Sequence, residues 1–213
     1  RRLAPRKVPT QQRAKETVDA ILAAAAYVLA KDGYEGLNTN RVAQRAGVSV
    51  GSLYQYFPGK EALVLALLER IFQRLFAHLA QRVGRRRTAE GSVRALVDGH
   101  IEWIAAHPVE GRFMYQAITL EVGGLRDTQR VTLAETKDRL LAPVVAHFAP
   151  FIERGELPEW PPLVLDVVLL GPAHEALRRY LAGNDALDPA MLRRVLPTLA
   201  WKSVAQQRRV RPA

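Results

Sequence analysis

Residues 38–63 read NTNRVAQRAGVSVGSLYQYFPGKEAL, and this stretch decides the interpretation of the whole chain. It contains two short helical patterns separated by AGVS. A sharp turn between helices needs a residue that accepts positive φ, which Gly47 supplies, and Val48 can fill the space beneath the turn. Pro58 ends the second pattern because proline has no backbone N–H to donate. The two patterns have the dimensions of a helix-turn-helix, although helical hairpins in a bundle use similar turns.

The ends and inward faces of these two helices can also be predicted. Asn38 or Thr39 is expected to cap the first and Ser49 the second, since a side-chain oxygen there accepts a bond from an unsatisfied N–H. The expected inward residues are Val42, Ala43 and Ala46 in the first helix and Leu53 and Phe57 in the second.

Apolar residues recur at helical spacing in the rest of the chain. A first helix is expected from residue 13 to a stop at Gly33, with one apolar stripe formed by Val18, Ile21, Leu22, Ala25, Val28 and Leu29. Further helices are expected at about 60–83, 89–106, 109–122, 126–153, 163–181 and 189–208. Pro143, Pro172 and Pro197 lie inside the last three and are expected to kink or split them. No alternating strand pattern occurs, so the predicted fold class is all-α.

Charge is distributed unevenly along the 213 residues. The net charge is +10, and residues 1–60 contain ten Lys or Arg against four Asp or Glu. Such an excess at one end is expected of a segment that meets a polyanion, or of a basic tail alone. Residues 1–12 are basic, contain two prolines and have no hydrophobic period, which predicts a flexible arm.

Composition excludes several protein classes. A hydrophobic content of 48% with 24% charged residues argues against disorder, and the absence of cysteine excludes disulfides and thiolate chemistry. No apolar run approaches the roughly 18 residues needed to cross a bilayer, and no secretory signal is visible. We therefore expect a cytoplasmic protein with no membrane partner.

The second short helix has an unusual surface for a soluble protein. Small residues at 49–52 would let its backbone approach a DNA groove closely. Tyrosine hydroxyls at 54 and 56, and the Lys60 ammonium, are suitable partners for phosphates. Gln55 can pair bidentately with adenine, which is worth about 1–3 kcal/mol of discrimination.

The segment AKDGYEGLNTNRVAQRAGVSVGSLYQYFPGKEAL, residues 30–63, resembles the DNA-binding domain of TetR-family transcriptional regulators. The family pattern is a threonine that opens the second helix, followed by VA..AGVS.G.LY.YF..KE.L. The sequence matches it at Thr39, Val42, Ala43, Ala46, Gly47, Val48, Ser49, Gly51, Leu53, Tyr54, Tyr56, Phe57, Lys60, Glu61 and Leu63. The resemblance covers about residues 13–65.

The resemblance implies a DNA-binding domain at 13–60, with its helix-turn-helix at about 38–57, and a helical ligand-binding and dimerisation domain at 61–213. It implies DNA contacts from Thr39, Asn40, Arg41, Ser49, Val50, Gly51, Ser52, Tyr54, Gln55, Tyr56 and Lys60. The histidine usual in the family at position 56 is a tyrosine here, which keeps a donor and loses titration near neutral pH. The resemblance further implies a homodimer, formed through the helices at about 163–181 and 189–208, that binds a pseudo-palindromic operator in double-stranded DNA.

A small-molecule effector is also implied, and polarisable residues of the middle helices are candidates to contact it. They are Phe72, Phe76, His100, Trp103, Phe113, Tyr115, Phe148 and Phe151. Packing in the core is the alternative role for each of them. His100 and His107 lie seven residues apart without a further ligand at metal-type spacing, so no metal site is predicted.

The sequence leaves three hypotheses about the function. The first is a ligand-responsive, dimeric repressor, in which the helix at about 60–83 transmits effector binding to the DNA-binding domain. The second is a non-specific nucleic-acid-binding or architectural protein that uses the basic arm. The third is an enzyme, but no nucleophile elbow, phosphate-binding glycine loop or metal cluster is present, so we predict neither catalytic residues nor a cofactor.

Overall fold

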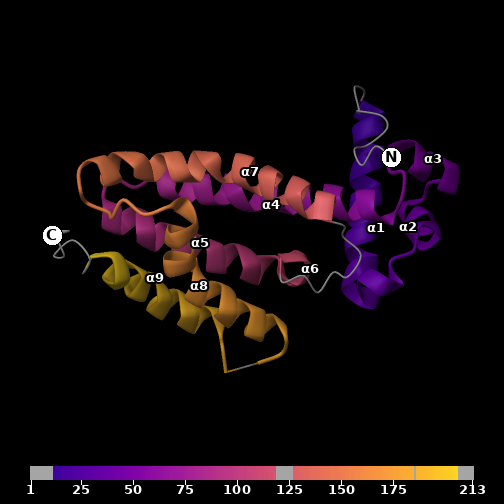
Figure 1. The fold of residues 1–213 in the computed structure, drawn as a ribbon. Coiled ribbons are helices and arrows are strands. Elements are labelled where there is room, and N and C mark those ends of the chain that lie inside the picture. The colour runs from indigo at the N-terminus through magenta and orange to yellow at the C-terminus, as the bar shows by residue number, and fades with distance from the viewer. Residues whose placement is uncertain (1–11, 119–126, 185, 206–213) are drawn as a thin grey trace. The chain divides into compact units, whose positions relative to one another are not determined.

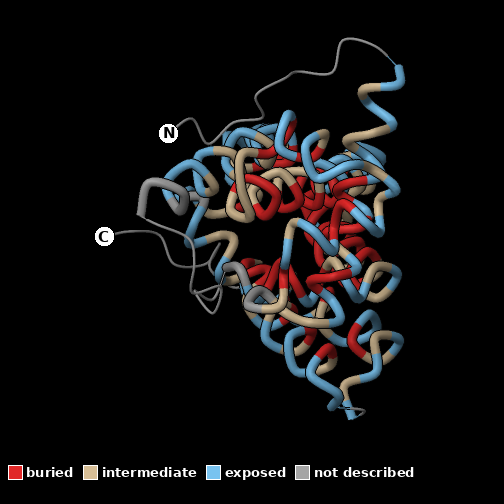
Figure 2. The backbone as a smooth tube through the Cα atoms, turned by 90° about the vertical axis from the view of Figure 1, so that its right-hand side faces the viewer, coloured by how far each residue is buried: buried red, intermediate tan, exposed pale blue. Residues whose placement is uncertain are grey.

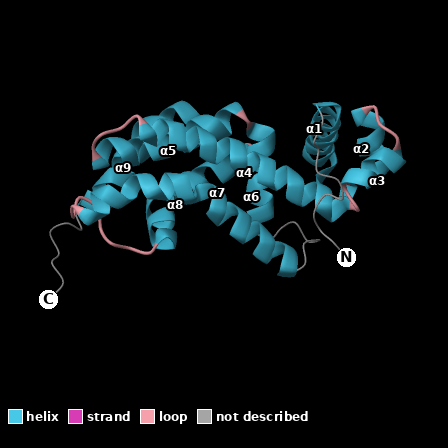
Figure 3. Ribbon diagram, turned by 90° about the horizontal axis from the view of Figure 1, so that it is seen from above, coloured by secondary structure: helices cyan, strands magenta, loops and turns pink. Residues whose placement is uncertain are grey.

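A computed structural model describes residues 12–118, 127–184 and 186–205 of the chain. Of the arm expected at 1–12, residues 1–11 lie outside these residues and Gln12 begins a helix; the expected helix ends at 119–122, 126 and 206–208 also lie outside them. Every regular element described is a helix, as Figure 3 shows, and the predicted all-α class is confirmed. The helices are α1 (Gln12–Gly36), α2 (Thr39–Ala46), α3 (Val50–Tyr56), α4 (Lys60–Gly84), α5 (Ala89–Ala106), α6 (Pro108–Ile118), α7 (Asp127–Glu153), α8 (Pro162–Leu181) and α9 (Pro189–Ala205) (Figure 1).

Contacts divide the chain into two units. Unit 1 consists of Arg1–Phe72 and Arg112–Lys137, and unit 2 consists of Gln73–Gly111 and Asp138–Ala213. The long helix α4 contributes its first half to unit 1 and its second half to unit 2. Within the described residues, every helix is too short or too polar to span a bilayer.

Unit 1 is built on the amino-terminal helices. The stripe expected on α1 is buried from Ile21 to Leu29, and α1 packs against α2, which packs against α3. Gly33 has φ 68° and interrupts the helical backbone as predicted, although one more helical turn follows it to Gly36. Figure 2 shows buried positions alternating with exposed ones along the helical turns, as expected when only one face of a helix meets the core.

Unit 2 is held by packing among α5, α8 and α9. The helices α7, α8 and α9 run through Pro143, Pro172 and Pro197, so of the two expected effects, a kink or a split, the split is wrong. A proline in a helix costs about 3 kcal/mol because it removes one hydrogen bond and its ring clashes with the preceding turn. Pro197 is itself buried, so packing of its ring offsets part of that cost.

A charged network joins three helices of unit 2. Asp98 on α5 accepts bonds from Arg193 of α9 at 2.7 and 3.1 Å and from Arg82 of α4. Glu102, one turn further along α5, lies 3.4 Å from Arg82 and 3.6 Å from His78. Partial burial would raise the pKa of Asp98, but the hydrogen bonds and charges of Arg193 and Arg82 lower it below its ordinary value. The network therefore stabilises the register of α9 against α5 and the second half of α4.

Candidate nucleic-acid interface

The turn between α2 and α3 forms from local sequence signals. Asn38 caps α2, since its Oδ1 accepts from the N–H of Asn40 at 2.8 Å, so Asn38 and not Thr39 takes this role. Gly47 ends α2 in the left-handed region, with φ 69° and ψ 28°. The N–H of Val48 then donates to the carbonyl of Ala43 at 3.0 Å, which closes the last turn.

Ser49 caps α3 as predicted. Its Oγ accepts from the N–H of Ser52 at 3.0 Å and lies 2.8 Å from the Ser52 hydroxyl. Val48, expected to plug the turn, is only half buried. Leu53 and Phe57 are fully buried beneath α3, so the inward face of this helix is confirmed and its opposite face is free of core contacts.

Residues on the outward face of α3 match most of the predicted contact set. Val50, Gly51, Tyr54 and Gln55 are exposed, and Ser52 is half buried beside them. Gly51 adds no side chain, so the backbone is accessible at the amino-terminal end of this face.

Tyr56 is far less exposed than Tyr54. The resemblance implies a surface position for it beside Tyr54, yet Tyr56 is 8% exposed where Tyr54 is 41% exposed. The reason is helical spacing: Tyr56 follows Leu53 by three residues and so shares its inward face. Counting from Leu53 in the sequence would have found this. Tyr56 chiefly packs in the core of unit 1.

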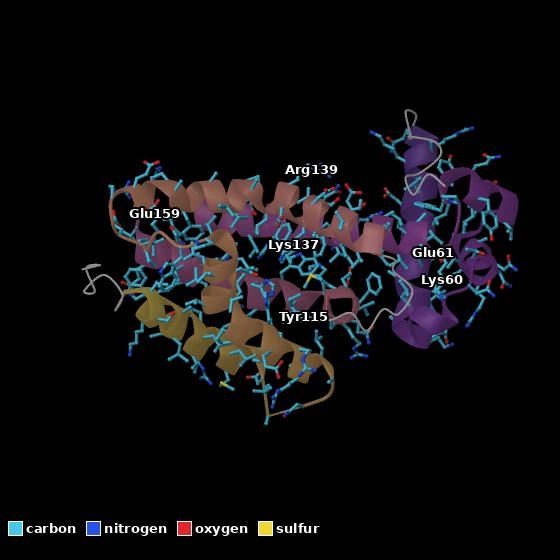
Figure 4. The ribbon with its side chains drawn as sticks, viewed as in Figure 1. Lys60, Glu61, Tyr115, Lys137, Arg139 and Glu159 are labelled. Atoms are coloured by element: carbon cyan, nitrogen blue, oxygen red, sulfur yellow. The ribbon has the colours of Figure 1, made fainter. Side chains whose placement is uncertain are left out.

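Two residues at the start of α2 lie near this face. The Thr39 Oγ1 is 3.2 Å from the Tyr54 Oη, which ties the start of α2 to the outward side of α3. Asn40 is exposed in the first turn of α2. Lys60 and Glu61 stand at the amino-terminal end of α4, within unit 1 (Figure 4).

Arg41 is engaged elsewhere. Its guanidinium lies 2.9 Å from a carboxylate oxygen of Asp32 on α1. Arg45, one turn further, lies over the ring of Tyr27 at 3.2 Å. The two arginines thus line the contact between α1 and α2, and a phosphate contact by Arg41 would compete with its ion pair.

The candidate effector residues are all buried. Phe72, Phe113 and Tyr115 belong to unit 1, whereas Phe76, His100, Trp103, Phe148 and Phe151 belong to unit 2.

The histidines of unit 2 have separate surroundings. His100 packs edge-on against His174 with ring centroids 4.8 Å apart, and burial lowers its pKa well below the ordinary value. His107 instead stacks on Trp103 at 4.5 Å. Across the described ranges, no group of three or more histidine or acidic side chains is arranged to hold a metal.

A cavity of about 100 Å³ lies within unit 2. Of the predicted set only Phe148 lines it; the other lining residues are Leu96, Leu141, Val144, Val145, Ile152, Leu157, Trp160, Leu165, Asp166, Leu169 and Leu170. Sequence reasoning missed these because aliphatic residues at helical spacing look the same in a core and in a cavity wall.

Comparison with known proteins places this geometry among bacterial regulators. Residues 21–67 match the family described as "Bacterial regulatory proteins, tetR family". The chain is 45% identical over 67 residues to the HTH-type transcriptional repressor KstR of Mycolicibacterium smegmatis, a match that covers 32% of this chain and 31% of KstR. The chain spans only about a third to two-fifths of the length of the curated relatives it matches.

Solved structures resemble the chain over most of its length. A TetR family transcription regulator from Marinobacter aquaeolei VT8 superposes with a TM-score of 0.73, at 18% identity, over 91% of this chain and 97% of that one. FadR from Bacillus subtilis, solved in complex with stearoyl-CoA, gives a TM-score of 0.72 at 20% identity, over 87% and 98% of the two chains. At these identities the likeness shows the shared fold.

Proposed function

The chain belongs, through residues 21–67, to the TetR family of bacterial regulatory proteins, and we propose that it is a dimeric, sequence-specific DNA-binding transcriptional regulator. The observation that carries the proposal is the outward face of α3. That face combines three exposed residues: Gly51, which has no side chain, Tyr54 and Gln55. A recognition helix needs this combination, because small residues permit close approach to the major groove and polar tips reach base edges and phosphates.

The roles proposed for single residues follow from where they lie. Gln55 reads a base, and residues 49–52 line the groove. Thr39, Tyr54 and Lys60 bind phosphates, with Asn40 nearby to contact base or backbone. Tyr56 supports the helix from its buried side, and Arg41 contributes only where a phosphate displaces Asp32.

Dimerisation through α8 and α9 is supported by their exposed apolar side chains. On α8, Leu163 is 70% exposed and Val167 is 59% exposed, while Leu169 and Leu170 are buried. On α9, Val195 and Leu199 are exposed and Leu192 is buried. Each helix therefore has one apolar side in the core and another in solvent. Exposed apolar side chains on two adjacent helices favour pairing with a second copy. A two-fold dimer would set its recognition helices about one DNA turn, roughly 34–36 Å, apart.

We propose that the regulator is a repressor released by a small-molecule effector. KstR is a repressor by name, and FadR was solved with stearoyl-CoA bound. Release requires that the effector bind one conformation more tightly than the one that fits the operator, which shifts the population away from DNA. The long α4, with residues in both units, is the candidate to transmit that shift.

Selection of binding sites from a random duplex library tests the function. We expect recovery of a pseudo-palindrome that the chain binds at least about 10³-fold more tightly than random duplex in a gel-shift assay. A non-specific nucleic-acid-binding protein would bind both duplexes alike, and that result would overturn the proposal. The same assay at two salt concentrations separates phosphate contacts from base contacts.

A further inference from the structure

We propose that the groove between α1 and α2 binds the phosphate group of a small phosphate monoester. This site is separate from the outward face of α3 and from the cavity of unit 2, and it does not depend on the proposed function. The groove has a volume of about 410 Å³, within the range of about 300–1,000 Å³ that small-molecule sites occupy. It lies wholly within unit 1, where the two helices pack against each other (Figure 1).

The walls of the groove are polar and mostly cationic. They are formed by Tyr27, Val28, Lys31 and Asp32 of α1 and by Arg41, Gln44 and Arg45 of α2. Val28 is buried and supplies an apolar part of the floor, whereas the three cations are exposed. Every wall residue belongs to α1 or α2, so α3 contributes nothing to the groove.

The charges of the groove match a dianion. Three cations stand against one carboxylate, and the Arg41 guanidinium lies 2.9 Å from the Asp32 carboxylate, so these two charges offset each other. Lys31 and Arg45 are then the two cations in excess, and within the described part of the chain neither forms an ion pair with a carboxylate. A phosphate monoester above its second pKa of about 6 carries the two negative charges that this excess requires.

Tyr27 holds Arg45 in an orientation suited to a phosphate. The Arg45 Cζ lies 3.2 Å from the centre of the Tyr27 ring, so the guanidinium stacks on the face of the ring. Stacking uses the flat face of the guanidinium and leaves the N–H groups at its edge to donate. That edge can form two parallel hydrogen bonds to phosphate oxygens. Because the stacked side chain is already ordered, less conformational entropy is lost on binding.

Other anions fit this groove less well. A phosphodiester, as in the DNA backbone, has a single charge and two terminal oxygens, whereas a monoester has three terminal oxygens and a second charge. A carboxylate, as in an acidic peptide, also has a single charge and two oxygens. Two cations in excess, one of them with an ordered pair of donors, therefore favour the monoester over both.

Four probes that share a phenyl ring test the chemical class: phenyl phosphate, methyl phenyl phosphate, benzoate and phenol. Dissociation constants come from ligand-observed NMR titrations of the full chain without DNA, at about pH 8 and constant ionic strength. We expect phenyl phosphate to bind at least about tenfold more tightly than each of the other three.

The remaining outcomes would overturn the proposal. Equal binding of methyl phenyl phosphate would identify the groove as a contact for a DNA backbone, and equal binding of benzoate would identify a contact for an acidic peptide. Equal binding of phenol would show that the phosphate is not recognised. No binding of phenyl phosphate at about 10 mM would exclude the site.

Variants assign the preference to the groove. Arg45→Gln should weaken phenyl phosphate binding at least about tenfold, because a charged hydrogen-bond donor is lost. Arg85→Gln is the matched control, since it removes the same charge from an exposed arginine of unit 2, and it should change the affinity by less than about twofold. Equal weakening by both variants would show attraction to the net charge of +10 alone and would overturn the proposal.

Two further positions keep the test decisive if Arg45→Gln does not fold. Lys31→Gln changes an exposed side chain and should weaken phenyl phosphate binding at least about fivefold. Tyr27→Leu retains every charge and removes the ring that orders Arg45, so binding should weaken about two- to fivefold, whereas Tyr27→Phe should bind as the parent chain does. Unchanged binding in Lys31→Gln or Tyr27→Leu would overturn the proposal. Because these titrations use no DNA and site selection uses no phosphate monoester, failure of one proposal is distinguishable from failure of the other.

Discussion

Replacing Gly51 with alanine should separate folding from DNA binding. Gly51 lies in α3, and a Cβ built on it has only one heavy atom within 4 Å, the Ser49 Oγ at 3.9 Å. The methyl group therefore meets no obstacle inside the protein. Alanine in a helix is favoured over glycine by about 0.5–1 kcal/mol, so the free energy of unfolding should stay constant or rise by up to that amount.

Operator binding should respond in the opposite direction. If the backbone at Gly51 approaches the groove closely, the added methyl displaces α3 and weakens the base contacts beside it. One good bidentate pair is worth about 1–3 kcal/mol, so its removal corresponds to about a five- to 150-fold rise in the dissociation constant.

Fluorescence anisotropy with the selected operator measures the affinity, and guanidinium chloride titration measures the stability. Gly84→Ala is the matched control, because a Cβ there has nothing within 4 Å and Gly84 lies at the end of α4 in unit 2. The Gly84→Ala variant should bind the operator with the same affinity as the parent chain. Unchanged operator affinity in a stable Gly51→Ala variant would refute the close approach of the Gly51 backbone to the DNA groove. A reduced free energy of unfolding would refute the conclusion that the added methyl group meets no obstacle inside the protein.

Four further outcomes are expected. Gln55→Ala should relax the preference at one base pair per half-site, and an unchanged selected motif would exclude it as a base reader. Lys60→Ala should reduce the slope of log affinity against log salt by about one for each phosphate that the lysine neutralises, which titrations between 50 and 200 mM salt measure. Burial lowers the pKa of His100, so its neutral form stabilises the fold. Stability from His100 is therefore full above its ordinary pKa of 6.5 and falls below it by up to about 1.4 kcal/mol per pH unit. Urea titrations from pH 7.5 to 5 should show a shallower dependence for His100→Gln, and an equal slope would contradict this. Val167→Asp should shift the chain from dimer to monomer in sedimentation, because it places a charge on the exposed apolar side of α8; an unchanged dimer would exclude that surface.

Local signals in the sequence predicted much of the fold. The conformation of Gly47, the cap at Ser49 and the end of α3 before Pro58 depend on residues within one helical turn, so their chemistry can be read directly from the chain. The burial of Tyr56 follows from its spacing from Leu53, while its predicted phosphate contact stays a prediction.

Long-range features could not be predicted in the same way. The Asp98–Arg193 pair joins residues 95 positions apart, and His100 meets His174 across a similar distance in sequence. Neither pair has a motif, because an ion pair or a ring contact requires no fixed spacing. The cavity likewise brings together residues of α5, α7, α8 and the connection between α7 and α8, and the aliphatic residues around it carry no signal of their own.

The contact between Thr39 and Tyr54 limits what these two residues can offer to DNA. Each hydroxyl carries one hydrogen, and the bond between the two oxygens, 3.2 Å apart, uses one of the two. While that bond persists, the pair has a single hydrogen left to donate and so acts as one donor to one phosphate oxygen. Thr39 and Tyr54 can donate to two phosphates only once the bond between them opens. A DNA backbone would therefore find one hydroxyl donor while the Thr39–Tyr54 bond persists, and two donors once it opens.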